Sequence, residues 1–246
     1  MFISVKRIYN AGLLLLSAVI IFVVFLFAKD RYKRNDFGQS FDAKARIAQG
    51  EMRSMQPLFE TCAIVAATDA RFMQAIVFPE VMRYSSLKDG IEAESLRTLY
   101  VQLGDEYADF SIGLFQMKPS FAKQVEEKST RLLSPAINKE LQLNYDSDNA
   151  EEIRRQRVNR LMDAEWQMIY LTAFTALCNE IYTNKKFGSN LEKLQWYATV
   201  YNAGFDRTDA YISKKIKEEH FYLQQDMPGK KFKYAAIAGW YLEREL

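Results

Sequence analysis

The chain has 246 residues, of which 49% are hydrophobic and 26% charged, and these values are typical of a globular protein. The net charge is +2, but six basic side chains and a single aspartate lie within residues 1–34, which leaves the rest of the chain slightly acidic. Because nucleic acid requires a basic binding face, we expect no nucleic-acid partner.

The N-terminal region contains an uncharged apolar run over residues 11–28, preceded by two basic residues. A run of this length favours a transmembrane helix, so residues 1–30 are predicted to be a membrane anchor that is not cleaved. A cleaved signal peptide is the alternative, although Leu26 fits its small-x-small cleavage pattern poorly. The basic flank at residues 29–34 favours a body on the cytoplasmic side of the membrane.

The first part of the body is predicted to be polar and then helical. Residues 31–56 form a stalk or a weak helix in this interpretation. One apolar helix is expected over residues 57–78, ended or kinked by Pro79, because proline disfavours helical backbone in the residue before it. A further helix over residues 91–103 is closed by Gly104, a residue type that readily adopts the left-handed cap conformation.

The middle of the chain is predicted to contain one irregular segment and one very long helix. Residues 105–118 are expected to be irregular or short-stranded, and Pro119 to open the next helix. A short helix is expected near residues 137–143. Helical spacing of apolar residues predicts a single helix from about 149 to 187, with Asp148 and a glutamate three positions later as its capping pair.

The C-terminal part of the chain again contains residues that are typical of helix starts and helix ends. Ser189 has the spacing of a capping residue, and the helix that follows is expected to end at Gly204. Two more helices are predicted over residues 207–224 and 231–245. The sequence therefore predicts an all-α fold, with one domain over residues 57–246 after the anchor and stalk.

Several kinds of chemistry lack their usual residues. The only histidine, His220, lies in a charged stretch and is interpreted as a solvated helix residue. With one histidine and two cysteines, neither a zinc site nor a Cys–His pair is supported, so we expect no metal and no cofactor. Cys62 and Cys178 both lie on apolar helix faces, where a disulfide and two buried free thiols are both reasonable.

Carboxylate chemistry remains, and Glu80 is the first candidate. It follows a largely apolar helix in the segment IVFPEVMRYSS, where its side chain is expected to be partly desolvated. Desolvation raises the pKa of a carboxyl group and keeps it protonated near neutral pH. Such a group can donate its proton to a glycosidic oxygen.

Two segments with characteristic residues follow Glu80 along the sequence. The first contains Gly113-Leu114-Phe115-Gln116-Met117-Lys118-Pro119, and the second closes a helix with Val200-Tyr201-Asn202-Ala203-Gly204. This order resembles the lysozyme-like lytic transglycosylases, which have a catalytic Glu at a helix end, then a G-L-M-Q-x-x-P-like segment, then a helix ending A-Y-N-A-G. The resemblance covers roughly residues 60–205.

The resemblance implies a lysozyme-like helical domain that cleaves peptidoglycan glycan strands, with Glu80 as its single acid and base. It implies that the first segment lines the floor of the glycan cleft and that Tyr201 faces and orients Glu80. The substrate-binding residues expected from it are Gly113, Phe115, Gln116, Met117, Tyr201 and Asn202. It also implies a body in the periplasm, anchored by one helix in the bacterial inner membrane, with an envelope protein complex as a further partner.

The sequence leaves alternatives open. Asp109 precedes the first segment and is a possible second carboxylate, as in the goose-type lysozymes, which use an aspartate to activate water; the other interpretation is a loop residue that caps a turn. Val81 follows Glu80 where the family has serine, which favours a glycan-binding scaffold that does not cut. A helical membrane protein without any glycan role is a third possibility.

Overall fold

The computed structural model describes residues 41–84, 96–223 and 230–244. Throughout these ranges the regular structure is helical, and the only β contacts are two isolated antiparallel bridges, Ile112 with Met117 and Phe221 with Phe232. The expected all-α class is therefore confirmed for the part of the chain that is described. The chain divides into two units, Met1–Ile47 and Ala48–Leu246, and the candidate residues all lie in the second.

The predicted anchor over residues 1–30 lies outside the described residues. Within the described ranges, no single helix has both the length and the apolar character that crossing a membrane requires. The helices Gln56–Val65 and Ala70–Arg83, separated by a short break and bent by 117°, reach the required length and apolar character only when taken together. Residues 41–54, in the second half of the predicted stalk, are helical.

The apolar helix predicted over residues 57–78 is two helices, α2 (Gln56–Val65) and α3 (Ala70–Arg83). They separate because Asp69 accepts hydrogen bonds from the backbone N–H groups of the first turn of α3, which makes it an N-cap. The second correction concerns Pro79, which lies inside α3 and does not end it. Buried residues run from Phe72 to Met82, so packing around the whole helix offsets the hydrogen bond that the proline removes.

The next segments follow the predictions closely. Residues 96–103 are helical and end at Gly104, whose φ is +96°; the earlier part of this predicted helix lies outside the described residues. An irregular segment leads to α5 (Pro119–Leu132), and the short predicted helix is α6 (Pro135–Leu141). Prolines start two of these helices and a glycine ends another, and each acts through its own backbone conformation, which the sequence shows directly.

The long helix predicted over residues 149–187 is also two helices, α7 (Ala150–Met162) and α8 (Ala164–Ile181). Asp163 separates them, because its side chain accepts from the N–H groups at the start of α8. The cap of α7 is Asn149, one residue after the predicted Asp148. Periodicity is continuous across both helices, so it does not reveal the break.

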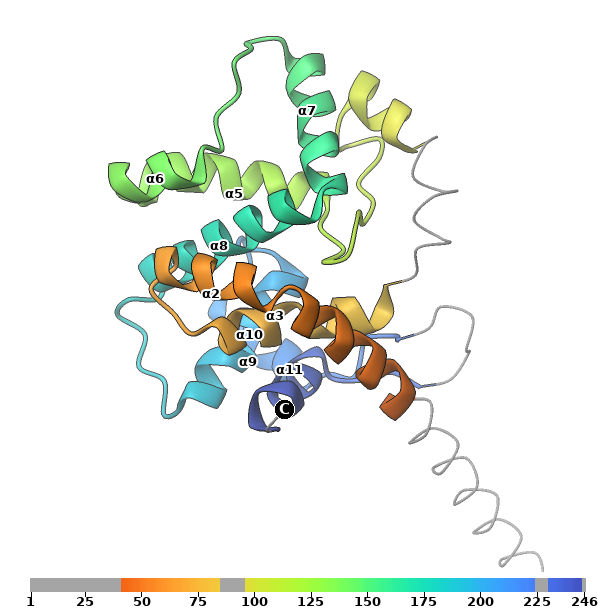
Figure 1. Cartoon of the computed structure of the whole chain (residues 1–246), viewed down its shortest axis with the longest axis vertical. Coiled ribbons are helices and arrows are strands. Elements are labelled where there is room, and N and C mark those ends of the chain that lie inside the picture. Colours follow the sequence, from red (N-terminus) through yellow and green to blue (C-terminus); the bar gives the residue numbers. More distant parts are fainter. Residues whose placement is uncertain (1–40, 85–95, 224–229, 245–246) are drawn as a thin grey trace, which may run out of the picture. The chain divides into compact units, whose positions relative to one another are not determined.

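Three helices complete the second unit: α9 (Asn190–Ala203), α10 (Asp209–Lys217) and α11 (Tyr234–Glu243). Ser189 caps α9 as predicted, and Gly204, with a φ of +95°, follows its last residue. The last two helices are shorter than predicted. α8 contacts α2, α3, α5, α6, α7 and α9, whereas α3 packs mainly on α2, α9 and α11 (Figure 1).

Candidate active site

Glu80 lies on α3 with only 3% of its surface exposed. α3 packs against α2, α8, α9 and α11, so its one glutamate is withdrawn from water with the apolar residues. This burial raises the pKa of Glu80 from 4.5 to about 7, against the opposing effects of Arg83 and Asn202. A carboxyl group with such a pKa is about half protonated at neutral pH.

Arg83, three residues after Glu80, covers one oxygen of the carboxyl group. Its Nη2 lies 2.5 Å from Glu80 Oε2, and its guanidinium group lies 4.9 Å from the centre of the Phe221 ring. This guanidinium group is the one polar contact of Glu80 Oε2 among the described residues, and Arg83 Nε has no hydrogen-bond partner there. Oε2 therefore becomes available to a new partner only when the Arg83 side chain moves away from it.

The other oxygen of Glu80, Oε1, is the first atom in a series of polar contacts that continues through Asn202 of α9 to His220. Asn202 Nδ2 lies 3.4 Å from Glu80 Oε1, a long hydrogen bond, and Asn202 Oδ1 lies 2.9 Å from His220 Nε2. The second ring nitrogen, Nδ1, lies 3.0 Å from the carbonyl oxygen of Glu218. Asn202, which the sequence indicated only as a substrate-binding residue, therefore lies beside Glu80, and its role in binding substrate stays a prediction.

The interpretation of His220 as a solvated helix residue is wrong. α10 ends at Lys217, and the backbone N–H of His220 donates to the carbonyl oxygen of Phe232 in a short extended pairing. The imidazole is half-buried, and this burial lowers its pKa below 6.5. No local signal in the sequence could have placed it next to Asn202, because the contact depends on how the segments after α9 fold back.

Two buried tyrosines lie close enough to Glu80 for its charge to act on them. Burial first, and then Glu80, raises the pKa of Tyr201 and of Tyr234 well above 10. Their hydroxyl groups donate elsewhere, Tyr201 to the carbonyl oxygen of Phe115 at 2.7 Å and Tyr234 to that of Ile76 at 3.0 Å. Tyr201 therefore does not orient Glu80 by a hydrogen bond; it ties α9 to the Gly113–Pro119 segment.

That segment is a tight turn closed by the Ile112–Met117 bridge. Phe115 and Met117 are buried to 0% and 1% exposure, so these two predicted substrate-binding side chains belong to the core instead. Gln116 is partly exposed, has a φ of +50°, and donates from Nε2 to the carbonyl oxygen of Gly113 at 2.9 Å. Of the side chains in this turn, Gln116 remains a candidate for contact with a ligand.

Gln167 on α8 holds this turn in place and was missed in the sequence. Its Oε1 accepts from the N–H of Phe115 at 2.8 Å, and its Nε2 donates to the carbonyl oxygens of Ile112 and Leu161 at 2.8 and 2.6 Å. Gly113 is required opposite it, because a Cβ there would lie 1.9 Å from Gln167 Nε2, at a φ of +69°. The apolar neighbours of Gln167 in the sequence gave no hint of this role.

Asp109 is engaged in holding the start of α5. Its Oδ1 accepts from the N–H of Ser120 at 3.0 Å, its Oδ2 accepts from the hydroxyl of Ser120 at 2.8 Å, and Lys118 Nζ lies 3.4 Å from Oδ2. Both carboxylate oxygens therefore have partners at a helix N-terminus. This arrangement agrees with the interpretation of Asp109 as a capping residue.

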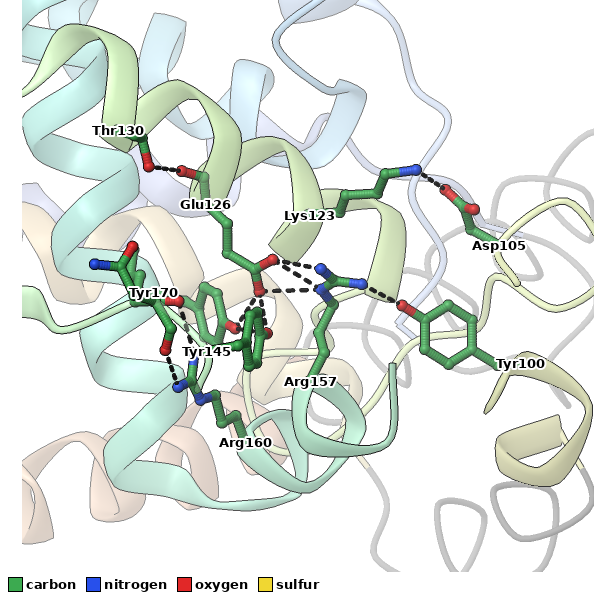
Figure 2. A network of polar contacts seen from close by, with 11 residues as sticks. Tyr100, Asp105, Lys123, Glu126, Thr130, Tyr145, Arg157, Arg160 and Tyr170 are labelled. Carbon is green, nitrogen blue, oxygen red and sulfur yellow. Dashed lines mark hydrogen bonds and ion pairs between the residues drawn. The ribbon is translucent and has the colours of Figure 1, made fainter. Parts of the chain in front are cut away.

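A second buried carboxylate, Glu126 on α5, differs from Glu80 in that both of its oxygens have several hydrogen-bond donors (Figure 2). Arg157 donates to both of its oxygens, at 2.5 Å from Nη2 and 3.0 Å from Nε, and Tyr145 and Tyr170 donate at 2.5 and 2.6 Å. Arg157 also donates to the hydroxyl of Tyr100 at 2.8 Å. A network satisfied to this extent joins helices and leaves no atom for a substrate.

Cys62 and Cys178 are free thiols, so of the two arrangements considered for them the structure has the unpaired one. Burial raises the pKa of both thiols, most strongly for Cys178. The part of the chain that the structure describes contains no group of three or more His, Cys, Asp or Glu side chains arranged to hold a metal ion.

Comparison with known proteins gives no family assignment. No family model matches the chain, and neither the curated proteins nor the solved structures include a match.

Proposed function

We propose that this protein is a divergent peptidoglycan lytic transglycosylase with a lysozyme-like fold, which cleaves the MurNAc–GlcNAc bond with Glu80 as its single catalytic residue. The observation that carries the proposal is the state of the Glu80 carboxyl group. It is 3% exposed, has a pKa of about 7, and has one oxygen whose only polar contact among the described residues is the movable Arg83 side chain. A protonated carboxyl group is what acid catalysis at a glycosidic oxygen requires, and Oε2 becomes available for it once Arg83 moves away.

The reaction needs only this one group. Protonated Glu80 donates its proton to the glycosidic oxygen as the bond from C1 to that oxygen breaks. The carboxylate then takes the proton of the C6 hydroxyl of the same sugar, whose oxygen forms a bond to C1. The products are a 1,6-anhydro sugar end and a free hydroxyl on the leaving strand, no water is consumed, and Glu80 is protonated again.

The environment of Asp109 favours this reaction over hydrolysis. A hydrolase of the inverting type needs a second carboxylate free to activate water at a distance from the acid. Both oxygens of Asp109 instead hold the first turn of α5 through Ser120. Release of that aspartate would uncap α5, so we give it a structural role.

The place of the protein in the cell follows from the same proposal. Peptidoglycan lies in the periplasm, so the body would lie there, attached to the inner membrane by the apolar run over residues 11–28. Its partners would be glycan strands, the membrane and an envelope protein complex. The scheme involves no metal and no cofactor, because the proton transfers use a side chain and the substrate alone.

One observation favours a second function, that of a glycan-binding scaffold that does not cut. Arg83 lies 2.5 Å from Glu80 Oε2 and stabilises the ionised form of the carboxyl group, which cannot donate a proton. For catalysis, Arg83 must therefore move when substrate binds. Its side chain is 25% exposed, so it has a path into solvent.

Digestion of purified peptidoglycan by the full-length chain in mild detergent tests the proposal, with the released muropeptides identified by mass spectrometry. We expect 1,6-anhydro ends, their loss in Glu80→Gln, and their retention in Asp109→Asn, which keeps an acceptor for Ser120. Reducing ends that vanish in Asp109→Asn would replace the lyase with a hydrolase. A folded protein that retains glycan without releasing fragments would support the scaffold.

A further inference from the structure

Glu80, Asn202 and His220 form a line of contacts that ends on a backbone carbonyl. The amide of Asn202 lies between the carboxyl group and the imidazole, 3.4 Å from Glu80 Oε1 and 2.9 Å from His220 Nε2. The far nitrogen of the imidazole lies 3.0 Å from the carbonyl oxygen of Glu218. Three different segments supply the side chains: α3, α9 and the extended residues after α10.

The donors and acceptors in this line restrict where a proton can be. A backbone carbonyl oxygen only accepts, so His220 Nδ1 must carry a hydrogen in either protonation state. The amide of Asn202 has one face that donates and one that accepts. When its Oδ1 faces His220, Nε2 must also carry a hydrogen, so the imidazole is a cation, and the amide NH2 group donates to an ionised Glu80.

The opposite arrangement follows when the amide is turned by half a rotation. The NH2 group then donates to a neutral His220 at Nε2, and Oδ1 accepts a hydrogen bond from protonated Glu80. The two amide orientations have nearly the same shape, and their assignment depends on the hydrogen-bond network. Both arrangements hold the same single proton, on His220 in the first and on Glu80 in the second.

We propose that His220 is a positioning residue that shares one proton with Glu80, and that the orientation of the Asn202 amide decides which of the two groups holds it. The exchange is balanced: imidazolium and carboxylate become imidazole and carboxylic acid, and the proton travels through solvent. The catalytic consequence rests on the proposed function, because only there does Glu80 act as an acid. The coupling itself does not depend on the reaction.

The surrounding groups act on this balance in both directions. Burial disfavours the carboxylate of Glu80 and the imidazolium of His220, so it favours the arrangement with the proton on Glu80. Arg83 favours the ionised Glu80, and Glu218 favours the charged imidazole. The cations facing His220 from the neighbouring segments, Lys215 of α10 and Lys231, act against the imidazolium.

Nuclear magnetic resonance tests the coupling directly, because His220 is the only histidine in the chain. The full-length protein is labelled with 15N-histidine, and the ring-nitrogen shifts are followed against pH. We expect the neutral imidazole to carry its hydrogen on Nδ1. We also expect Glu80→Gln to lower the pKa of His220 by about one unit, since the new amide donates to Oδ1 and fixes Asn202 with its NH2 group on His220.

Asn202→Ala provides the matched control. In that background Glu80→Gln should leave the titration of His220 unchanged, because the connecting amide is gone. A neutral imidazole with its hydrogen on Nε2, or a His220 titration that ignores Glu80 in the presence of Asn202, would overturn the inference. If Asn202→Ala does not fold, the change that Glu80→Gln makes in the titration of His220, with Asn202 in place, still decides.

These measurements use no peptidoglycan, so they separate this inference from the proposed function. Coupled titration in a protein that releases no muropeptides would remove the transglycosylase and leave the proton pair standing. Cleavage that depends on Glu80, together with an uncoupled His220, would support the transglycosylase and remove the proton pair.

Discussion

Replacement of Glu80 by glutamine should stabilise the protein in a way that grows with pH. The folded pKa of about 7 is higher than the 4.5 expected of an unfolded glutamate, so between these values the folded state binds more protons than the unfolded state. Stability is then lost as pH rises through this window. With these two values, the wild type loses about 2–3 kcal/mol between pH 5 and pH 8, a loss that the Glu80→Gln variant avoids.

The assay is urea unfolding of full-length wild type and Glu80→Gln at pH 5, 6, 7 and 8, in the same detergent. The exposed glutamate at position 140 serves as the control, since Glu140→Gln removes one carboxylate without uncovering a buried site. We expect the difference between Glu80→Gln and wild type to widen by about 2–3 kcal/mol over this range. A difference that stays constant with pH would show that burial does not raise the pKa of Glu80, and the acid role would lose its physical basis.

Three further outcomes follow from contacts described above. Arg83→Met should raise the pKa of Glu80, because it removes the cation that favours the carboxylate, and so move the alkaline limb of the pH profile of muropeptide release to higher pH; an unchanged limb would contradict this. Glu126→Gln should cost about 3–5 kcal/mol in urea unfolding because it leaves a buried arginine without its anion, and a loss below about 1 kcal/mol would refute the reasoning. Gly113→Ala should cost about 2 kcal/mol or more, since the added Cβ meets Gln167 in a left-handed backbone; circular dichroism during thermal unfolding would reveal it, and an unaltered midpoint would argue against this close contact.

Local signals in the sequence predicted much of the fold. Pro119, Ser189 and Gly204 each fix a helix boundary through their own backbone or side chain, and the structure has those boundaries where they were expected. The helical class follows in the same way from apolar periodicity. Residues 105–118 were also expected to be irregular or short-stranded, and they contain only turns and one isolated bridge.

The sequence did not reveal where two long apolar stretches each divide into two helices. Asp69 and Asp163 each cap a new helix, but an aspartate on a helix is equally common as a solvated side chain, and only the tertiary bend shows which applies. The environment of Glu80 was anticipated as partly desolvated, whereas its neighbour His220 and the support that Gln167 gives the Gly113 turn were not. Their contacts join residues far apart in the chain, and no periodicity or spacing in a single sequence records them.

The packing of α11 on α3 ties the chemistry of Glu80 to the order in which the chain folds. Phe78 packs on Tyr241 with 4.3 Å between ring centres, and Tyr234 reaches the carbonyl oxygen of Ile76 across 158 positions of sequence. Contacts between such distant residues form late, since the intervening chain must first be brought together. A nascent or partly folded chain would therefore hold Glu80 in water as an ordinary, ionised glutamate. Under the proposed function, Glu80 would become an acid only when α11 docks, so cleavage of glycan would wait until the fold is complete.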